Sequence, residues 1–223
     1  MQKLKIIFSL ASEIVFKNSI RFDGLLTFLK VAANNNNTND VIEIPLQKVV
    51  TRYSEDWFYD CSNGVVEGQV CKQLDNVKKQ INVDGLNMSK INISSGIYCS
   101  NVYKFERIQA ESVIFYVIGD KKEIVELLSG CTHLGAMRKN DFGRIKKVEI
   151  IEQDFEHAYM DGNILRRDIP LEVEHFTNFL KDGVILSFGK YRPPYNPEFD
   201  QSQFLLLKEG SNLNAIELDF LKK

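Results

Sequence analysis

The amino-acid sequence predicts an α+β fold built around one antiparallel sheet. Apolar residues at positions 4, 6, 8 and 10 alternate as in a strand that is buried on one face. Two further apolar runs of strand length flank a short segment with helical spacing. With an earlier helix and strand, the elements follow the order βαββαβ. We therefore expect one sheet with both helices on one face, made of strands 3–10, one within 48–61, 111–118 and 144–151.

The first helix is expected over residues 20–33, where apolar side chains recur on one side and Asp23 stands near the start. The polar, low-complexity run 34–40 then predicts a flexible loop. Two short strands fit the segments 48–53 and 56–61.

The second half of the core repeats the pattern of strand and helix. Gly119 and Asp120 interrupt the strand 112–118, and a helix over 121–129 ends at Gly130. At 223 residues, the chain is expected to form a single domain spanning 1–223. Its expected parts are a core of 1–60 and 108–152, an insertion at 61–107, and a C-terminal extension at 153–223 with short strands near 184–188 and 204–207.

A basic loop bounded by Gly135 and Gly143 lies between the second helix and the last core strand. Glycine permits backbone angles and close approaches that a Cβ atom forbids. Backbone N–H groups, guanidinium groups and ammonium groups together suit phosphate oxygens. An ordinary solvated loop with surface charges fits the same spacing equally well. The cations of the segment are Arg138, Lys139, Arg144, Lys146 and Lys147, which stand against Asp141 and Glu149.

The order of strand, helix, glycine-rich basic loop and strand resembles the C-terminal half of RAMP superfamily proteins, which build CRISPR effector complexes. The stretch 134–148, LGAMRKNDFGRIKKV, resembles the loop pattern of that superfamily: a glycine, basic residues, then an aromatic residue, glycine, arginine or alanine, and valine. It is most similar to the type IV CRISPR subunit in the Cas-five role. The resemblance implies an RRM-like (ferredoxin-like) core and a loop that holds the 5′ handle of the guide RNA.

Two later stretches, 163–170 (NILRRDIP) and 189–195 (GKYRPPY), are similar to segments of the same family. The chain departs from the family pattern at Arg167, where a proline is common. It also departs at 140–141, where a small residue and a glycine are usual and this chain has Asn and Asp. The RNA-binding candidates implied by the resemblance are Gly135, Arg138, Lys139, Gly143, Arg144, Lys146, Arg166, Arg167, Lys190 and Arg192.

Two aromatic residues of an expected strand, Trp57 and Tyr59, share one of its faces. Core packing is the favoured role, because the only tryptophan of a chain is usually buried. The alternative is base stacking, as on RRM sheets, so both residues are also candidate RNA contacts. A second basic and aromatic cluster around Arg192 fits a contact with a subunit or a nucleotide, or a structural turn.

Composition is that of a soluble globular protein, with 44% hydrophobic and 26% charged residues. A net charge of −2 argues against a large RNA footprint and leaves room for a local basic patch. No apolar run reaches the roughly 18–20 residues of a membrane helix. The four cysteines lack zinc spacing, so we expect reduced thiols in the cytoplasm, no metal and no cofactor.

No residue set indicates catalysis. His133 stands just before the basic loop, and RAMP processing nucleases often use such a histidine, but a surface or partly buried histidine is the favoured interpretation. We expect a non-catalytic subunit of a type IV CRISPR ribonucleoprotein that binds guide RNA (crRNA), a backbone-forming RAMP subunit and the large subunit, and reaches target DNA only indirectly. The alternatives are a metal-independent endoribonuclease that processes guide precursors and an interaction domain without RNA.

Overall fold

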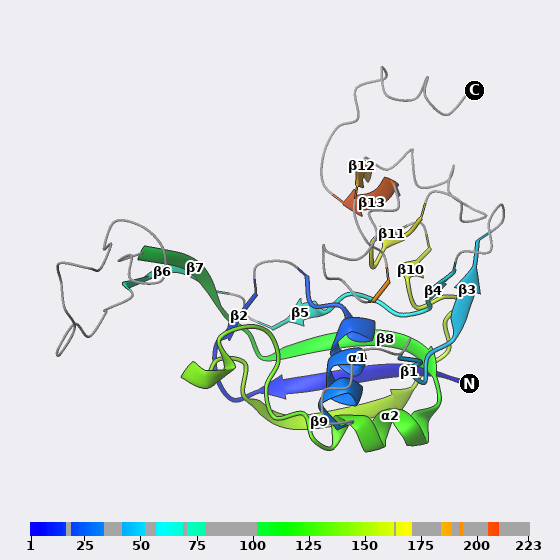
Figure 1. Ribbon diagram of the computed structural model, residues 1–223, viewed down its shortest axis with the longest axis horizontal. Coiled ribbons are helices and arrows are strands. Elements are labelled where there is room, and N and C mark those ends of the chain that lie inside the picture. The colour runs from blue at the N-terminus through cyan, green and yellow to red at the C-terminus, as the bar shows by residue number, and fades with distance from the viewer. Residues whose placement is uncertain are drawn as a thin grey trace, which may run out of the picture.

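In the computed structural model, a four-stranded antiparallel sheet forms the centre of the protein, in the order β5–β8–β1–β9 (Figure 1). The structure describes residues 1–16, 19–33, 42–51, 57–68, 71–78, 102–162, 164–170, 184–188, 192–193 and 205–209. The sheet strands are β1 (Gln2–Leu10), β5 (Val65–Glu67), β8 (Ser112–Gly119) and β9 (Ile145–Glu152).

Both helices, α1 (Phe22–Ala33) and α2 (Lys121–Leu128), cover the same face of this sheet (Figure 1). The Asp120 side chain caps α2 by accepting a hydrogen bond from the backbone N–H of Glu123 at 3.0 Å. The four sheet strands and two helices follow the chain order β1, α1, β5, β8, α2, β9, which is a βαββαβ order. Its first and third strands, β1 and β8, lie in the centre of the sheet, and its second and last, β5 and β9, lie at the edges, as in the ferredoxin-like arrangement. The predicted fold class, α+β with an antiparallel sheet and helices on one face, is therefore confirmed.

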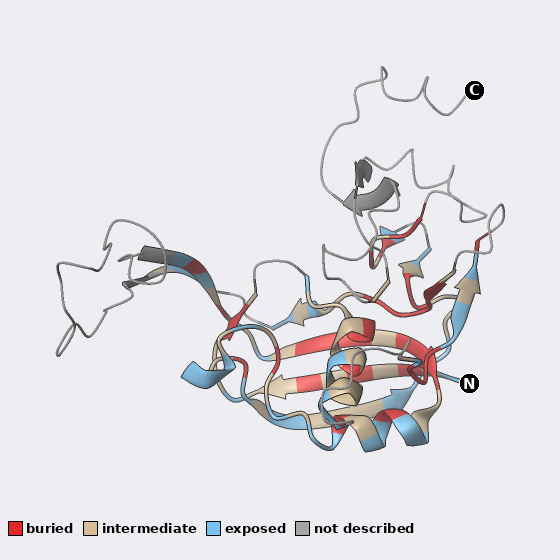
Figure 2. Cartoon of the chain, viewed as in Figure 1, coloured by how far each residue is buried: buried red, intermediate tan, exposed pale blue. Residues whose placement is uncertain are grey.

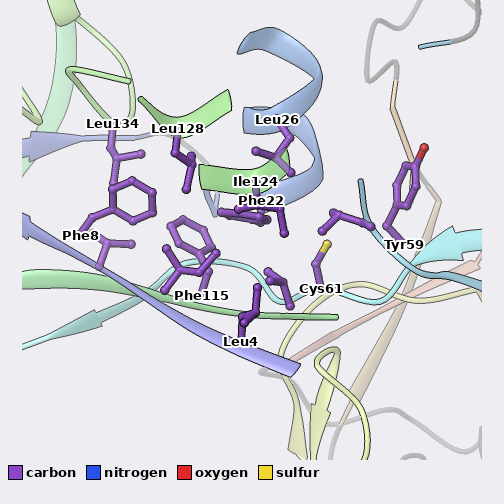
Figure 3. Close-up of a cluster of buried hydrophobic side chains, with 14 of the residues drawn as sticks. Leu4, Phe8, Phe22, Leu26, Tyr59, Cys61, Phe115, Ile124, Leu128 and Leu134 are labelled. Carbon is purple, nitrogen blue, oxygen red and sulfur yellow. The ribbon is translucent and has the colours of Figure 1, made fainter. Parts of the chain in front are cut away.

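Alternation along β1 and a continuous apolar run in β8 build the core between sheet and helices. Leu4, Ile6 and Phe8 of β1 are fully buried, and the intervening residues are only partly covered (Figure 2). Figure 3 shows Leu4 and Phe8 on the side of the sheet that faces the buried side chains of α1 and α2. Phe115 of β8 lies at the centre, with ring centroids 5.6 Å from Phe8 and 5.2 Å from Phe22. Burying one such side chain stabilises the fold by roughly 1.5–3 kcal/mol.

The strand at the β8 edge of the sheet, β5, is not the one that the sequence predicted there. The segments β3 (Lys48–Val50) and β4 (Trp57–Tyr59) do form, but they pair with each other. Among the described residues of the predicted range 48–61, one bridge, from Cys61 to Val117, connects to β8. On the side of β8 that faces away from β1, the strand that pairs with it is β5.

A bulge at residues 62–64 separates the bridge at Cys61 from the paired strand β5. The partner of Cys61 is Val117, whereas that of Val65 is Ile114, so one extra residue is accommodated between the two points. The Ser62 hydroxyl accepts the hydrogen bond of the Tyr116 N–H at 2.9 Å. A Cβ atom at Gly64 would lie 3.0 Å from the Phe115 ring, so the close approach suits glycine.

The remaining strands lie outside the central sheet. The insertion contributes β6 (Cys71–Lys78) and β7 (Val102–Gln109), which pair along their length and project away from the sheet, joined at the base by β2 (Ile14–Val15) (Figure 1). Past the core, β10 (Met160–Asp161) pairs with β11 (Ile164–Leu165). The two short strands expected in the extension form a pair, β12 (Val184–Phe188) with β13 (Leu205–Glu209). Among the described residues, no helix is long and apolar enough to span a membrane.

A buried carboxylate, Asp60, holds the chain that follows β9. It is fully buried and accepts hydrogen bonds from the backbone N–H groups of Ala158 at 2.7 Å and Tyr159 at 3.3 Å. The imidazole of His157 lies 3.4 Å from the other carboxylate oxygen. Burial raises the pKa of Asp60, and the backbone hydrogen bonds and His157 only partly oppose this.

Replacing Asp60 with asparagine is expected to change how stability depends on pH. A carboxyl whose pKa is raised on folding adds stability below its unfolded pKa, and this is lost as pH rises through the folded pKa. Asparagine keeps an acceptor for Ala158 but does not titrate. The unfolding free energy of Asp60→Asn relative to the parent should therefore increase as the pH rises above about 4, the ordinary pKa of an aspartate, measured by urea unfolding.

The matched control is Asp154→Asn. The ammonium of Lys3, 2.8 Å away, lowers the pKa of this exposed carboxyl, so its contribution is lost as pH falls. The control should therefore stay level with the parent above about pH 4 and change only at lower pH. Parallel pH curves for parent and Asp60→Asn would show that Asp60 does not titrate differently on folding.

Candidate nucleic-acid interface

The basic loop predicted from sequence, here called the glycine loop (residues 134–144), connects α2 to β9 as a closed turn. The Leu134 N–H donates to the Gly143 carbonyl oxygen at 2.8 Å, and His133 and Arg144 form a bridge beside it. Gly135 and Gly143 have φ of +78° and +69°, which side chains disfavour. A Cβ atom at Gly143 would overlap the Leu134 carbonyl oxygen. Both glycines are therefore required by the local geometry.

The glycine loop is anchored to the segment that follows β1. The backbone N–H of Gly143 donates to the Glu13 carbonyl at 2.7 Å, and that of Ala136 donates to the Val15 carbonyl at 2.7 Å. The Ser12 hydroxyl accepts from the Arg144 N–H at 2.9 Å and donates to the Asp141 carbonyl at 2.6 Å. These bonds fix the loop at the end of the central strand. Ser12 is a positioning residue that sequence reasoning missed.

Two residues other than glycine take left-handed backbone angles in this loop. Met137 (φ 56°) and Asp141 (φ 64°) flank a short 3₁₀ helix, η3 (Arg138–Asn140). Asp141 lies at the point where the RAMP loop pattern usually has glycine. Aspartate is among the residues that tolerate left-handed backbone angles. The departure from the family pattern therefore preserves the turn. Strained backbone of this kind is typical of functional sites.

Positive charge on the glycine loop is only partly neutralised. Arg144 pairs with Asp141 at 3.3 Å, and Lys147 of β9 pairs with Glu149 at 3.1 Å. Within the described part of the chain, the exposed side chains of Arg138, Lys139 and Lys146 have no acidic partner. Exposed cations on a rigid turn are suited to bind phosphate oxygens, because no existing ion pair has to be broken first.

His133 lies at the base of the loop and is held by neighbours. Its Nδ1 lies 2.9 Å from the Thr132 hydroxyl and its Nε2 lies 3.2 Å from the Asp141 carboxylate. The thiol of Cys131 donates to the His133 carbonyl at 3.7 Å, and burial raises the pKa of this thiol. No group of metal-ligating side chains occurs among the described residues.

Arg166 lies on the other face of the sheet. Its guanidinium stacks on the ring of Tyr116 at 3.7 Å and pairs with Asp161 at 2.7 Å. Tyr116 neighbours Phe115 on β8 and so points away from the helices. A cleft of about 510 Å³ opens here, lined by Val65, Tyr116, Ile164, Arg166 and others. The sheet therefore separates Arg166 from the glycine loop.

The sequence matches the profile of the family described as CRISPR type IV associated protein Csf3 over residues 47–204. The chain belongs to this family. The protein is thus a component of a type IV CRISPR complex. The matched range contains the glycine loop and Arg166 but begins after β1 and α1. A comparison with curated proteins gives no match to the chain.

Two of the candidate residues lie in the interior of this family member. The side chain of Arg167 is 1% exposed and pairs with the fully buried Asp23 at 3.0 Å. Tyr59 is 2% exposed and packs into the core (Figure 3). An RNA strand has no access to either side chain, so we correct their assignment from RNA contact to core. For Tyr59, core packing is the role that the sequence already favoured.

Trp57 lies at the opposite end of the sheet from the glycine loop. It is partly buried, with the Lys48 ammonium 4.4 Å and the Arg192 guanidinium 5.0 Å from the ring centroid. β3 and β4 adjoin the end of β8 that pairs with the start of β1, whereas the loop follows the end of β1. A strand of this length spans roughly 30 Å, so one nucleotide cannot contact both sites. Lys190 lies outside the described residues.

Proposed function

We propose that this Csf3-family protein is a non-catalytic RNA-binding subunit in the Cas-five role, in which the glycine loop grips the 5′ handle of the guide RNA. The observation that supports this most is a set of exposed cations, Arg138, Lys139 and Lys146, on or beside a turn held by backbone hydrogen bonds. None of the three has an acidic partner among the residues that the structure describes. A rigid loop loses little entropy when it binds, so its donors are available without rearrangement.

As a RAMP subunit, the protein would cap one end of a filament and contact the backbone-forming RAMP subunit and the large subunit. The β6–β7 hairpin supports this proposal, because it extends beyond the sheet and carries exposed side chains such as Leu74, 71% exposed (Figures 1 and 2). Target DNA would be read by pairing with the guide, and the protein would contact it only indirectly.

The alternative function, cleavage of guide precursors, is tested by a single variant. Repeat-containing RNA incubated with the purified protein is expected to give no product on a denaturing gel. His133→Ala should leave guide processing in the assembled complex unchanged, because Asp141 and Thr132 hold the imidazole in a structural contact. RNA scission that depends on His133 would identify an endoribonuclease instead. If the complex assembles but this subunit makes no contact with RNA, the protein is an interaction domain without RNA.

A further inference from the structure

Phe28 is a large apolar side chain on the solvent side of α1. The residue is 46% exposed, whereas Phe22 and Leu26 of the same helix are fully buried. Residues 22 and 26 are four apart and share the inner face, and residue 28 is rotated by about 200° from residue 26. Packing of α1 on the sheet therefore does not require an aromatic residue at this position.

The exposed ring of Phe28 is in contact with the glycine loop. The Arg138 guanidinium lies 4.3 Å from the ring centroid, within the range of a cation–π contact. Arg138 belongs to η3, between the two left-handed residues Met137 and Asp141. Within the described residues its guanidinium has no acidic partner. This contact places the guanidinium over the ring, and no described residue accepts a hydrogen bond from its N–H groups.

We propose that Phe28 and Arg138 form a stacking platform for the base of one single-stranded RNA nucleotide next to the phosphates held by the glycine loop. This inference rests on the proposed function and adds α1 to the RNA interface. Bases stack on aromatic rings and on guanidinium planes, and such stacking tolerates any sequence. An acidic peptide would pair with Arg138 through charge alone and would not need the ring of Phe28.

The platform makes a prediction that separates stacking from charge. Loss of a stacked base weakens single-strand binding by about fivefold to more than a hundredfold. Phe28→Ala should therefore lower the affinity for RNA while the salt slope stays at the parent value, because no phosphate contact is removed. Arg138→Ala should lower both the affinity and the slope, the slope by roughly 0.7.

The experiment uses the assembled complex and single-stranded RNA oligomers that carry 2-aminopurine at successive handle positions. Fluorescence should be quenched at one position with the parent and recover with Phe28→Ala. Phe28→Tyr keeps a ring and should retain the affinity and the quenching; Phe28→Leu keeps apolar volume without a ring and should lose both. Val125→Ala, at a 48% exposed position on α2, is the matched control and should behave as the parent.

Failure of this inference can be distinguished from failure of the proposed function. If the parent binds RNA and the loop cations matter, but Phe28→Ala and Phe28→Leu bind and quench as the parent does, the platform is wrong and the loop proposal stands. If Phe28→Ala instead impairs complex assembly with RNA affinity intact, the ring contacts a protein subunit and the platform is also overturned. If the loop cations have no effect on RNA binding either, both proposals fail together.

Discussion

Replacing Arg167 with alanine is expected to lower the unfolding free energy by about 3–5 kcal/mol, the range for breaking a buried ion pair by removing one partner. The Arg167 guanidinium lies 3.0 Å from the Asp23 carboxylate and donates to the Tyr59 carbonyl at 2.9 Å and to the Cys61 sulfur at 2.9 Å. Asp23 is fully buried at the start of α1, so the variant leaves a charge in the interior. Thermal or urea unfolding measures the loss.

The double variant Arg167→Met with Asp23→Leu is the control for this interpretation. It removes both charges together, so it should recover much of the loss suffered by the single variant, as replacing a whole buried pair with apolar residues often does. Cys61 adds no charge to this site, because burial raises the pKa of its thiol to about 12 and keeps it neutral. Full stability of Arg167→Ala together with weakened RNA binding would restore Arg167 to the RNA interface.

Arg167 also illustrates what the sequence could and could not predict. The core strands and helices were predictable because β1 carries clear alternation, β8 a continuous apolar run and α1 helical spacing. β1 and α1 bury the face that the pattern indicates, and β8 is buried along most of its length. Arg167 carries the same charge as its neighbour Arg166, and only the position of Asp23, 144 residues away in the sequence, shows that it is buried. The strand β5 was missed because it is three residues long and follows a bulge.

The candidate site was predictable in part for the same reason. The glycine loop is continuous in sequence, so its glycines and cations could be found by spacing alone. Ser12 and Phe28, however, reach the loop through contacts between distant segments: the hydroxyl of Ser12 bonds to Asp141 across 129 residues. Neither residue forms a motif with its own neighbours. An exposed aromatic on an amphipathic helix is a weak sequence signal that becomes informative only beside Arg138.

Replacing Arg138, Lys139 and Arg144 together with alanine is expected to weaken the binding of handle RNA by a hundredfold or more. A charge-assisted hydrogen bond contributes on the order of 1.5–3 kcal/mol, so two lost contacts suffice for this effect. Each lost phosphate contact should also reduce the salt slope by roughly 0.7. Arg144 should contribute least, because its guanidinium must first leave Asp141, 3.3 Å away.

Folding stability should barely change in this triple variant, since exposed cations and half-exposed ion pairs contribute about 0–1 kcal/mol. Lys122→Ala, which removes an exposed cation from α2, is the matched control and should retain the affinity of the parent. Gly143→Val keeps every charge but cannot close the loop, because its side chain would overlap the Leu134 carbonyl; its RNA affinity should fall as well. The affinities are measured in the assembled complex at several salt concentrations. A triple variant that assembles and binds with the affinity and salt slope of the parent would show that the glycine loop does not grip the guide RNA.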